Sequence, residues 1–107
     1  ILKEVSYTTA GLNDIIAKNI SVSQAYPNPF NSGTRLDYYI DPELGDMDIV
    51  IDILDISGRR VQTLIDKKVS SGFHSVFWES KNRATGVYFI QLLTTDFIST
   101  QKIVLLK

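Results

Sequence analysis

The sequence has no cysteine among its 107 residues. A disulfide framework, a thiolate metal site and a cysteine nucleophile are therefore excluded. The redox compartment stays open, since many exported bacterial proteins lack disulfides. The single histidine, His74, has no complementary catalytic group at motif spacing, and no Gly-x-Ser-x-Gly elbow, phosphate-binding loop or zinc spacing occurs. We therefore expect a protein that is not an enzyme and that needs no cofactor.

Long apolar runs and a strong net charge are also lacking. No run approaches the roughly eighteen residues of a membrane span, and the net charge is −1, so neither membrane insertion nor nucleic-acid binding is expected. Charge is nevertheless uneven. Residues 1–53 carry three Lys/Arg against eight Asp/Glu, a net of −5, and residues 54–107 carry eight against four, a net of +4. Solubility explains this bias most simply, and a basic docking face in the second half is the alternative.

The chain begins at Ile1 and carries no signal peptide, so we interpret it as a fragment or a processed piece. Residues 1–20 do not share the pattern of the rest. Their apolar side chains have the spacing of a short strand or of a single helical turn, interrupted by loop-type residues. We expect residues 1–20 to be a linker or the end of a preceding cargo domain, and residues 21–107 to form one domain.

After residue 20, short apolar runs alternate with turn residues at intervals of about ten, which is typical of an all-β sandwich or barrel. The apolar content of 44%, with five Tyr, five Phe and one Trp, is ample for one packed core. Seven strands are predicted, at residues 22–26, 34–40, 47–54, 60–65, 73–79, 87–93 and 98–106.

Alternation within these strands separates a core face from an outer face. The predicted core-facing side chains are Leu36, Tyr38, Ile40, Ile49, Ile51, Ile53, Tyr88, Ile90, Leu92, Ile103 and Leu105. The strand at 73–79 has two apolar faces. Because Trp78 is the largest apolar side chain in the protein, its face is expected inward, which leaves Phe73 and Phe77 outward.

Two irregularities are expected around the fourth strand. Val61 and Leu64 are three residues apart rather than two or four, which indicates a β-bulge. The turn at residues 55–59 contains Gly58, the natural candidate for a positive φ. On the preceding strand, Asp52 is predicted to point outward.

Pro27 and Pro29 deny two backbone donors to any strand ladder, so residues 27–33 are not a central strand. Proline also favours extended backbone in the residue before it. We expect this stretch to be a rigid arm that crosses from one sheet to the other, with the side chains of Tyr26 and Phe30 tucked in as anchors.

Two weaker binding signals remain. One loop carries the carboxylates of Asp41, Glu43, Asp46 and Asp48. They could supply oxygen ligands for Ca²⁺, but the EF-hand spacing is missing, so a solvated acidic turn is the preferred interpretation and no metal site is predicted. Tyr39, Phe73 and Phe77 are loose candidates for a sugar-binding platform, which would need coplanar exposed rings.

Several phrases occur in the order typical of one family. They are Tyr26-Pro27-Asn28-Pro29-Phe30-Asn31, Asp55-Ile56-Ser57-Gly58-Arg59, Trp78, Ala84-Thr85-Gly86-Val87-Tyr88, Lys102 and the terminal Lys107. On these residues the chain resembles, over residues 21–107, the C-terminal sorting domain of type IX secretion cargo in its type A form. Ser32-Gly33 departs from the family pattern, which often has Pro-Ser there and so stiffens the arm.

The resemblance implies an immunoglobulin-like antiparallel β-sandwich that directs an attached cargo through the type IX translocon. Such cargo passes the periplasm and reaches the cell surface or the medium, where a surface sortase commonly cuts upstream of the domain, here expected within residues 9–21. The resemblance places translocon recognition on Gly86, Val87, Tyr88, Lys102 and Lys107.

The chain also ends within its last predicted strand, which indicates that this end is structurally needed or is itself the signal. We expect Lys102 to project to solvent. We expect Gly86 to occupy a position where a Cβ would clash or where φ is positive.

Two other functions remain open at this point. Immunoglobulin-like assembly domains of flagellar hook-capping proteins carry similar phrases. A carbohydrate-binding accessory sandwich of a secreted hydrolase would share the fold class and the exposed aromatic residues.

Overall fold

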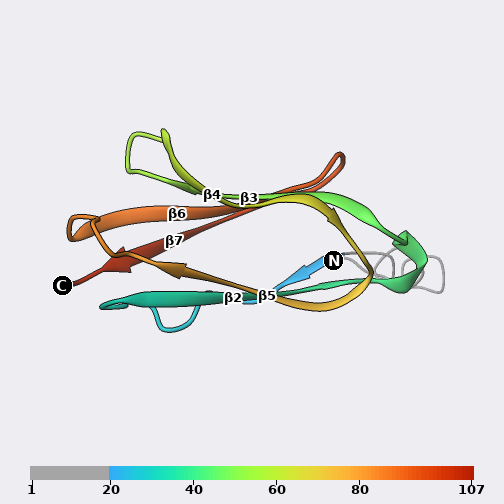
Figure 1. Cartoon of the computed structure of the whole chain (residues 1–107), viewed down its shortest axis with the longest axis horizontal. Helices are drawn as coiled ribbons and strands as arrows, with labels where there is room; N and C mark the ends of the chain where they lie inside the picture. The colour runs from blue at the N-terminus through green and yellow to red at the C-terminus, as the bar shows by residue number, and fades with distance from the viewer. Residues whose placement is uncertain (1–19) are drawn as a thin grey trace, which may run out of the picture.

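The computed structural model describes residues 20–107 and shows two antiparallel β-sheets that face each other (Figure 1). One sheet has the strand order β1-β2-β5 and the other the order β4-β3-β6-β7. The elements are β1 (Ile20–Val22), β2 (Gly33–Ile40), η2 (Pro42–Leu44), β3 (Met47–Leu54), β4 (Arg60–Val69), β5 (Gly72–Glu79), β6 (Gly86–Leu93) and β7 (Ile98–Leu105). The predicted all-β sandwich of seven strands is confirmed for this part of the chain. The expected linker lies outside the described residues, apart from Ile20.

The core lies between the sheets and follows the predicted alternation. All eleven side chains predicted to face inward are buried, Tyr88 being the most exposed of them at 8%. Trp78 is 1% exposed, whereas Phe73 and Phe77 are 86% and 55% exposed, so the predicted orientation of this strand is confirmed. Trp78 is too large to be placed anywhere but inside without exposing a wide apolar surface.

The first and fourth strands differ from their predicted bounds. Strand β1 ends at Val22, and pairing returns only as an isolated bridge between Tyr26 and Arg35. Between them, the backbone N–H of Ala25 donates to the side chain of Gln101 at 2.8 Å. Strand β4 continues to Val69, four residues beyond the prediction. The prediction stopped too early because residues 66–68, Asp66-Lys67-Lys68, are all charged and show no apolar alternation. A strand at a sheet edge can carry such residues, since both of its faces can be exposed to water.

The irregular pairing of β3 with β4 confirms the predicted bulge. Consecutive residues Ile51 and Asp52 pair with Ile65 and Thr63, so Leu64 is extra, and a second shift leaves Val61 unpaired. Asp52 alternates with the inward-facing Ile51 and Ile53, yet it is only 6% exposed. Its carboxylate accepts a hydrogen bond of 2.7 Å from the Thr63 hydroxyl, which compensates for burial on the outer side of the sheet.

The β3–β4 turn is held by one carboxylate. Asp55 accepts hydrogen bonds from the Ser57 hydroxyl at 2.6 Å and from the backbone N–H groups of Ser57 and Arg59 at 3.0 Å each. The side chain of Arg59 adds an ion pair at 3.2 Å. Gly58 has a φ of 88°, so its predicted positive φ is confirmed.

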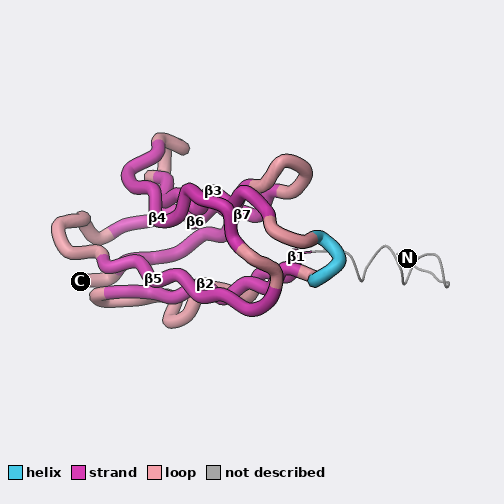
Figure 2. Tube along the Cα trace, turned by 45° about the vertical axis from the view of Figure 1, so that its right-hand side comes forward, coloured by secondary structure: helices cyan, strands magenta, loops and turns pink. Residues whose placement is uncertain are grey.

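The acidic connection between β2 and β3 contains the short helix η2 (Figure 2). Asp41 caps it by accepting a bond of 2.9 Å from the backbone N–H of Glu43, and Asp48 pairs with Lys68 at 3.5 Å. Within residues 20–107 no group of three or more acidic or histidine side chains has a metal-binding arrangement. No helix in that range is long and apolar enough to cross a membrane.

The hydrogen bonds to Asp55 predict that the free energy of unfolding depends on pH in the acidic range. The Ser57 hydroxyl and then the Arg59 backbone N–H lower the pKa of Asp55 from 3.8 to about 2. A depressed pKa in the folded state stabilises the fold above the unfolded pKa, and that contribution is lost as the pH falls from about 4 to about 2. The free energy of unfolding of wild type should therefore exceed that of Asp55→Asn most at about pH 5.

Urea unfolding of both proteins between pH 5 and pH 2 measures this difference, which should shrink as the solution becomes more acidic. Asp66→Asn on β4 controls for the loss of one negative charge, because Asp66 is exposed and its carboxylate forms no hydrogen bond or ion pair with another described residue. A difference between wild type and Asp55→Asn that stays constant across this pH range would contradict the assignment.

Candidate recognition surface

The hairpin of β6 and β7 forms one side of the four-stranded sheet, and β7 is its edge strand. Opposite residues pair in register, with Tyr88 facing Ile103 and Phe89 facing Lys102. Because side chains alternate between faces, one set of residues enters the core and the next set lies on the outside of the sandwich. The five predicted recognition residues are therefore divided between different environments.

The side chain of Tyr88 faces the core between the two sheets. It is 8% exposed, its ring meets Trp78 edge-on at a centroid distance of 5.3 Å, and its hydroxyl donates to the Ala84 carbonyl at 2.8 Å. A partner cannot reach this ring without opening the core. Tyr88 therefore fixes the backbone of residues 84–88 to the aromatic core beneath it.

Val87 and Lys102 belong to the outside. Lys102 is exposed, which confirms the expectation that it projects to solvent. Its cross-strand neighbour Phe89 and the pair of Val87 with Val104 are half-buried, and Leu54 on β3 lies opposite Phe89. We call Leu54, Val87, Phe89, Lys102 and Val104 the outer-face patch. It combines an apolar floor with one cation, a composition suited to protein contacts.

Gly86 begins β6 in open space within the described chain. A Cβ built at this position meets no atom within 4 Å, so of the two expected alternatives, a clash or a positive φ, the clash is not found. The positive φ is found, at 158°, a backbone conformation that residues with a side chain rarely adopt. Backbone conformation, and not packing among residues 20–107, therefore explains why glycine stands here.

Lys107 is fastened to the connection between β5 and β6. Its backbone N–H donates to the Thr85 hydroxyl at 3.0 Å, and its ammonium group donates to the Lys81 carbonyl at 2.8 Å. These bonds hold residue 107 beside Gly86. The predicted recognition residues Gly86 and Lys107 are thus brought together at one end of the sandwich.

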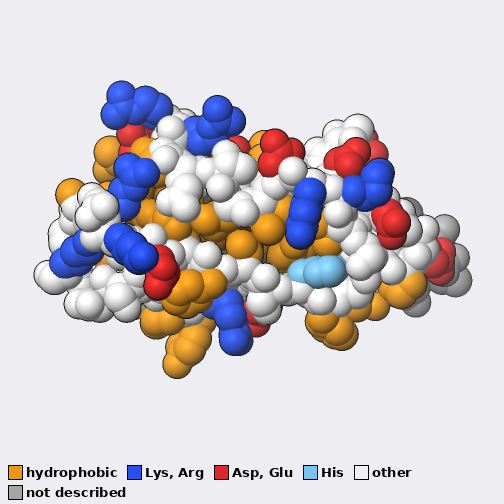
Figure 3. Space-filling model, viewed as in Figure 1, with side chains coloured by type: hydrophobic (Ala, Val, Ile, Leu, Met, Phe, Trp, Pro, Cys, Tyr) orange, Lys and Arg blue, Asp and Glu red, His pale blue; other side chains and the backbone are white. Residues whose placement is uncertain are grey.

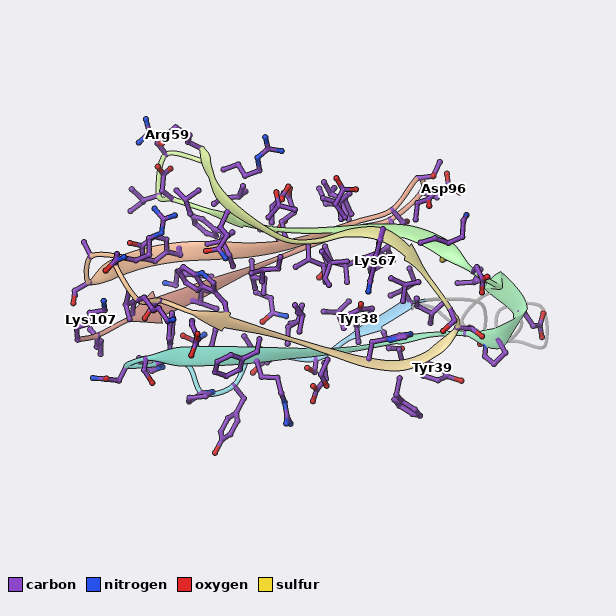
Figure 4. The ribbon with its side chains drawn as sticks, in the orientation of Figure 1. Tyr38, Tyr39, Arg59, Lys67, Asp96 and Lys107 are labelled. Atoms are coloured by element: carbon purple, nitrogen blue, oxygen red, sulfur yellow. The ribbon has the colours of Figure 1, made fainter. Side chains whose placement is uncertain are left out.

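That end is positively charged. The β3–β4 turn, the β5–β6 connection and residues 106–107 meet there, and Figure 4 places both Arg59 and Lys107 at this end. These three segments and the strand residues next to them carry five cations, Arg59, Arg60, Lys81, Arg83 and Lys107, which we call the basic end. Two carboxylates, Asp55 and Glu79, leave a net of +3. Lys and Arg side chains gather toward this end in Figure 3, whereas the acidic residues 41–48 and Asp96 lie at the other.

The arm between β1 and β2 covers part of the β7 edge. Phe30 donates from its backbone N–H to the Val104 carbonyl at 2.9 Å and accepts from the Leu106 N–H at 2.8 Å. Upstream, Tyr26 pairs with Arg35 of the other sheet. The predicted crossing of the arm from one sheet to the other is therefore confirmed.

Asn28 replaces the backbone donors that the two prolines lack. Its side-chain amide donates to the Lys102 carbonyl at 3.0 Å, and its side-chain oxygen accepts from the Val104 N–H at 2.9 Å. The side chain of Asn28 thus makes the donor and acceptor bonds to the edge of β7 that the backbone of a paired strand residue would make. The sequence signal for this role is an asparagine between Pro27 and Pro29, and our reading of the sequence missed it.

The two predicted anchors of the arm behave differently. Phe30 is 3% exposed and its ring lies 5.6 Å from that of Trp78, so this anchor is confirmed. Tyr26 is 74% exposed, and its predicted burial is wrong. Pairing with the outward-facing Arg35 directs Tyr26 outward, and the neighbouring Ala25 is buried in its place.

The outer face of the three-stranded sheet tests the sugar-binding alternative. Tyr39 and Phe73 are neighbours with a centroid distance of 4.5 Å, but their planes are inclined by 44°. Figure 4 shows Tyr39 on the side of β2 away from the core and Tyr38 on the core side. A coplanar platform is therefore not formed by this pair.

Comparison with known proteins identifies a family. The sequence profile described as "Secretion system C-terminal sorting domain" matches residues 24–106. Among solved structures, the chain is similar to the crystal structure of dimeric latent PorU from Porphyromonas gingivalis, with a TM-score of 0.62 and 14% identity. The similarity covers 82% of this chain and 9% of the PorU chain, and it shows a shared fold. A search of curated proteins found no match.

The Asn28 contacts predict local protection of the β7 edge. Asn28→Ala removes the acceptor of the Val104 N–H, whereas Asn28→Asp keeps an oxygen acceptor there. Amide hydrogen exchange at Val104 should become faster in the alanine variant and stay slow in the aspartate variant. The alanine variant should also lose about 1 kcal/mol of unfolding free energy, the usual contribution of such bonds.

Thr100 provides an internal reference for this measurement. Alternate residues of an edge strand face the same side, so its N–H shares the edge with that of Val104, but no described residue bonds it there. Unchanged exchange at Val104 in Asn28→Ala would refute the role given to the amide side chain.

Proposed function

The chain belongs to the secretion system C-terminal sorting domain family, and from this membership we propose that the outer-face patch and the basic end are the parts that the translocon reads. The domain is a sorting module of type IX secretion that directs the cargo attached upstream of it to the cell surface or medium. The position of Lys102 carries the proposal: it is an exposed cation on the final hairpin, next to half-buried apolar side chains.

The division of the hairpin into two faces supports this proposal. Ile103 and Leu105 are completely buried, so the inner face of β7 packs in the core and is closed to a partner. Lys102 and Val104 alternate with them on the accessible face. A folded signal needs such an arrangement, because the residues that hold the strand in place are not those that a partner touches.

Gly86 and Tyr88 receive different roles under this proposal. Gly86 leaves its backbone uncovered at the basic end, which allows a partner to approach the main chain closely. Tyr88 acts from inside, through its bond to Ala84, by positioning the segment that carries Gly86 and Val87. Recognition then rests directly on Gly86, Val87, Lys102 and Lys107.

Processing by a surface sortase, after transit through the periplasm, completes the proposed route. The expected cleavage range of residues 9–21 lies outside the described residues except at its end. Ile20 is 6% exposed and pairs with Ile40 in β1. Cleavage before Ile20 would leave every described strand intact, so we place the cut within residues 9–19.

No catalytic role is proposed for the domain. The imidazole of His74 lies 2.7 Å from the Ser70 carbonyl and stacks on Tyr38 at a centroid distance of 5.3 Å. Both contacts are those of a structural histidine, and the family is a sorting signal rather than a catalyst.

Secretion of a reporter tests the function. A reporter with an export signal peptide at its N-terminus and this chain at its C-terminus should reach the surface or medium of a host that has a type IX system. Lys102→Glu should reduce the exported fraction by about tenfold, because charge reversal at a contact opposes docking. Fractionation and immunoblotting of periplasm, surface and medium measure the outcome.

Lys67→Glu on β4 is the matched control, because it makes the same charge change at an exposed position of the same sheet. It should be exported like wild type. Retention of the wild-type fusion in the periplasm would refute the proposed function. Equal export of the Lys102→Glu and Lys67→Glu fusions would instead refute the role of Lys102.

A further inference from the structure

The connection between β5 and β6 forms a groove at the basic end. Two recesses, of about 590 Å³ and about 320 Å³, lie on either side of Glu79 and Lys81, which line both. The larger recess extends to Gln62 and Arg83, and the smaller one extends to Lys107. We call the two together the basic groove.

Three cationic side chains and one fixed amide line this groove. The side chains of Lys81 and Lys107 are exposed cations, and Arg83 uses one nitrogen on the Val61 carbonyl at 2.9 Å, which leaves its other donors available. The oxygen of the Gln62 side chain already accepts from Trp78 at 2.9 Å, so its amide nitrogen is the group left for a ligand. The Trp78 bond also fixes Gln62 in place.

Carboxylate side chains are scarce in the same walls. Glu79 is the only carboxylate that lines either recess among the described residues, and its oxygen lies 3.8 Å from the Lys81 ammonium. Both side chains are mostly exposed, at 62% and 78%, so this ion pair is weak and exchangeable. A ligand that brings carboxylate oxygens would meet three cations and a fixed amide donor.

We infer that the basic groove binds an acidic peptide segment of a protein partner. This inference rests on the proposed function, since it supplies the chemistry of the surface that the basic end would meet in the secretion machinery. Carboxylate side chains of the segment pair with Arg83, Lys81 and Lys107, and Arg83 offers the planar fork that suits a carboxylate. The apolar wall of Phe77, 55% exposed, accommodates an intervening side chain.

The shape of the groove favours a peptide over an anionic membrane. A bilayer presents a flat surface, whereas these cations and amides line two recesses. Ile56 and Leu106 are exposed at the same end, at 74% and 52%, and a membrane would use them as inserted side chains. Lipid vesicles are therefore the competing probe.

Binding by the full chain tests the inference. The probes are a fluorescent peptide of alternating Glu and Gly, its Lys and Gly counterpart, and vesicles containing phosphatidylglycerol. The acidic peptide should bind, shift the backbone amide resonances of residues 79–83, and dissociate as salt is raised. The double variant Lys81→Glu/Lys107→Glu should weaken binding by about tenfold.

The double variant Lys67→Glu/Lys68→Glu is the matched control. Both double variants change the net charge from −1 to −5. If both weakened peptide binding equally, the peptide would be responding to the net charge of the protein and not to the groove, and the inference would be overturned. Binding to the vesicles but not to the acidic peptide would overturn it in favour of a lipid surface. Circular dichroism verifies folding of each variant.

Failure of this inference can be separated from failure of the proposed function. An exported wild-type reporter together with no binding of the acidic peptide would refute the groove and leave the sorting function in place. A wild-type reporter that stays in the periplasm refutes the sorting function whatever the peptide does.

Discussion

The position of Phe30 is the constraint on which the final hairpin depends. Its ring packs against Trp78 in the core, while its backbone bonds Val104 and Leu106 at the edge of β7. Trp78 in turn meets Tyr88, whose hydroxyl donates to the Ala84 carbonyl just before β6. One buried aromatic group therefore joins the arm, both sheets and the last strand, so that the edge strand is held from two sides instead of fraying.

This arrangement separates folding from signalling on the same strands. The inner residues of β6 and β7 contribute to the core, and the arm satisfies much of the exposed edge of β7. An uncovered edge would invite pairing with other chains. What remains accessible is the outer-face patch around Lys102 and the basic end around Lys107, which together offer a partner both apolar contact and positive charge.

The alternation of apolar and polar residues predicted the strands and their buried faces, which depend on residue type and spacing. It did not predict the features that depend on contacts between residues far apart in the chain. Alternation of Ile49, Ile51 and Ile53 was enough to place β3 and its buried face. The exposure of Tyr26 depends on its pairing with Arg35, and the protection of Val104 depends on an amide 76 residues away, so neither follows from strand alternation. The family motifs suggested the candidate recognition residues, and strand alternation separately predicted that Tyr88 faces inward, which the structure confirms.

The central claim is that the outer face of the final hairpin contacts the secretion machinery. Site-specific photo-crosslinking in exporting cells tests it most directly, with a photoreactive residue at position 102 in one fusion and at position 67 in another. The account predicts that position 102 crosslinks to a component of the type IX translocon while the export intermediate is present and that position 67 does not. Crosslinks to the translocon from position 67 with none from position 102 would contradict it.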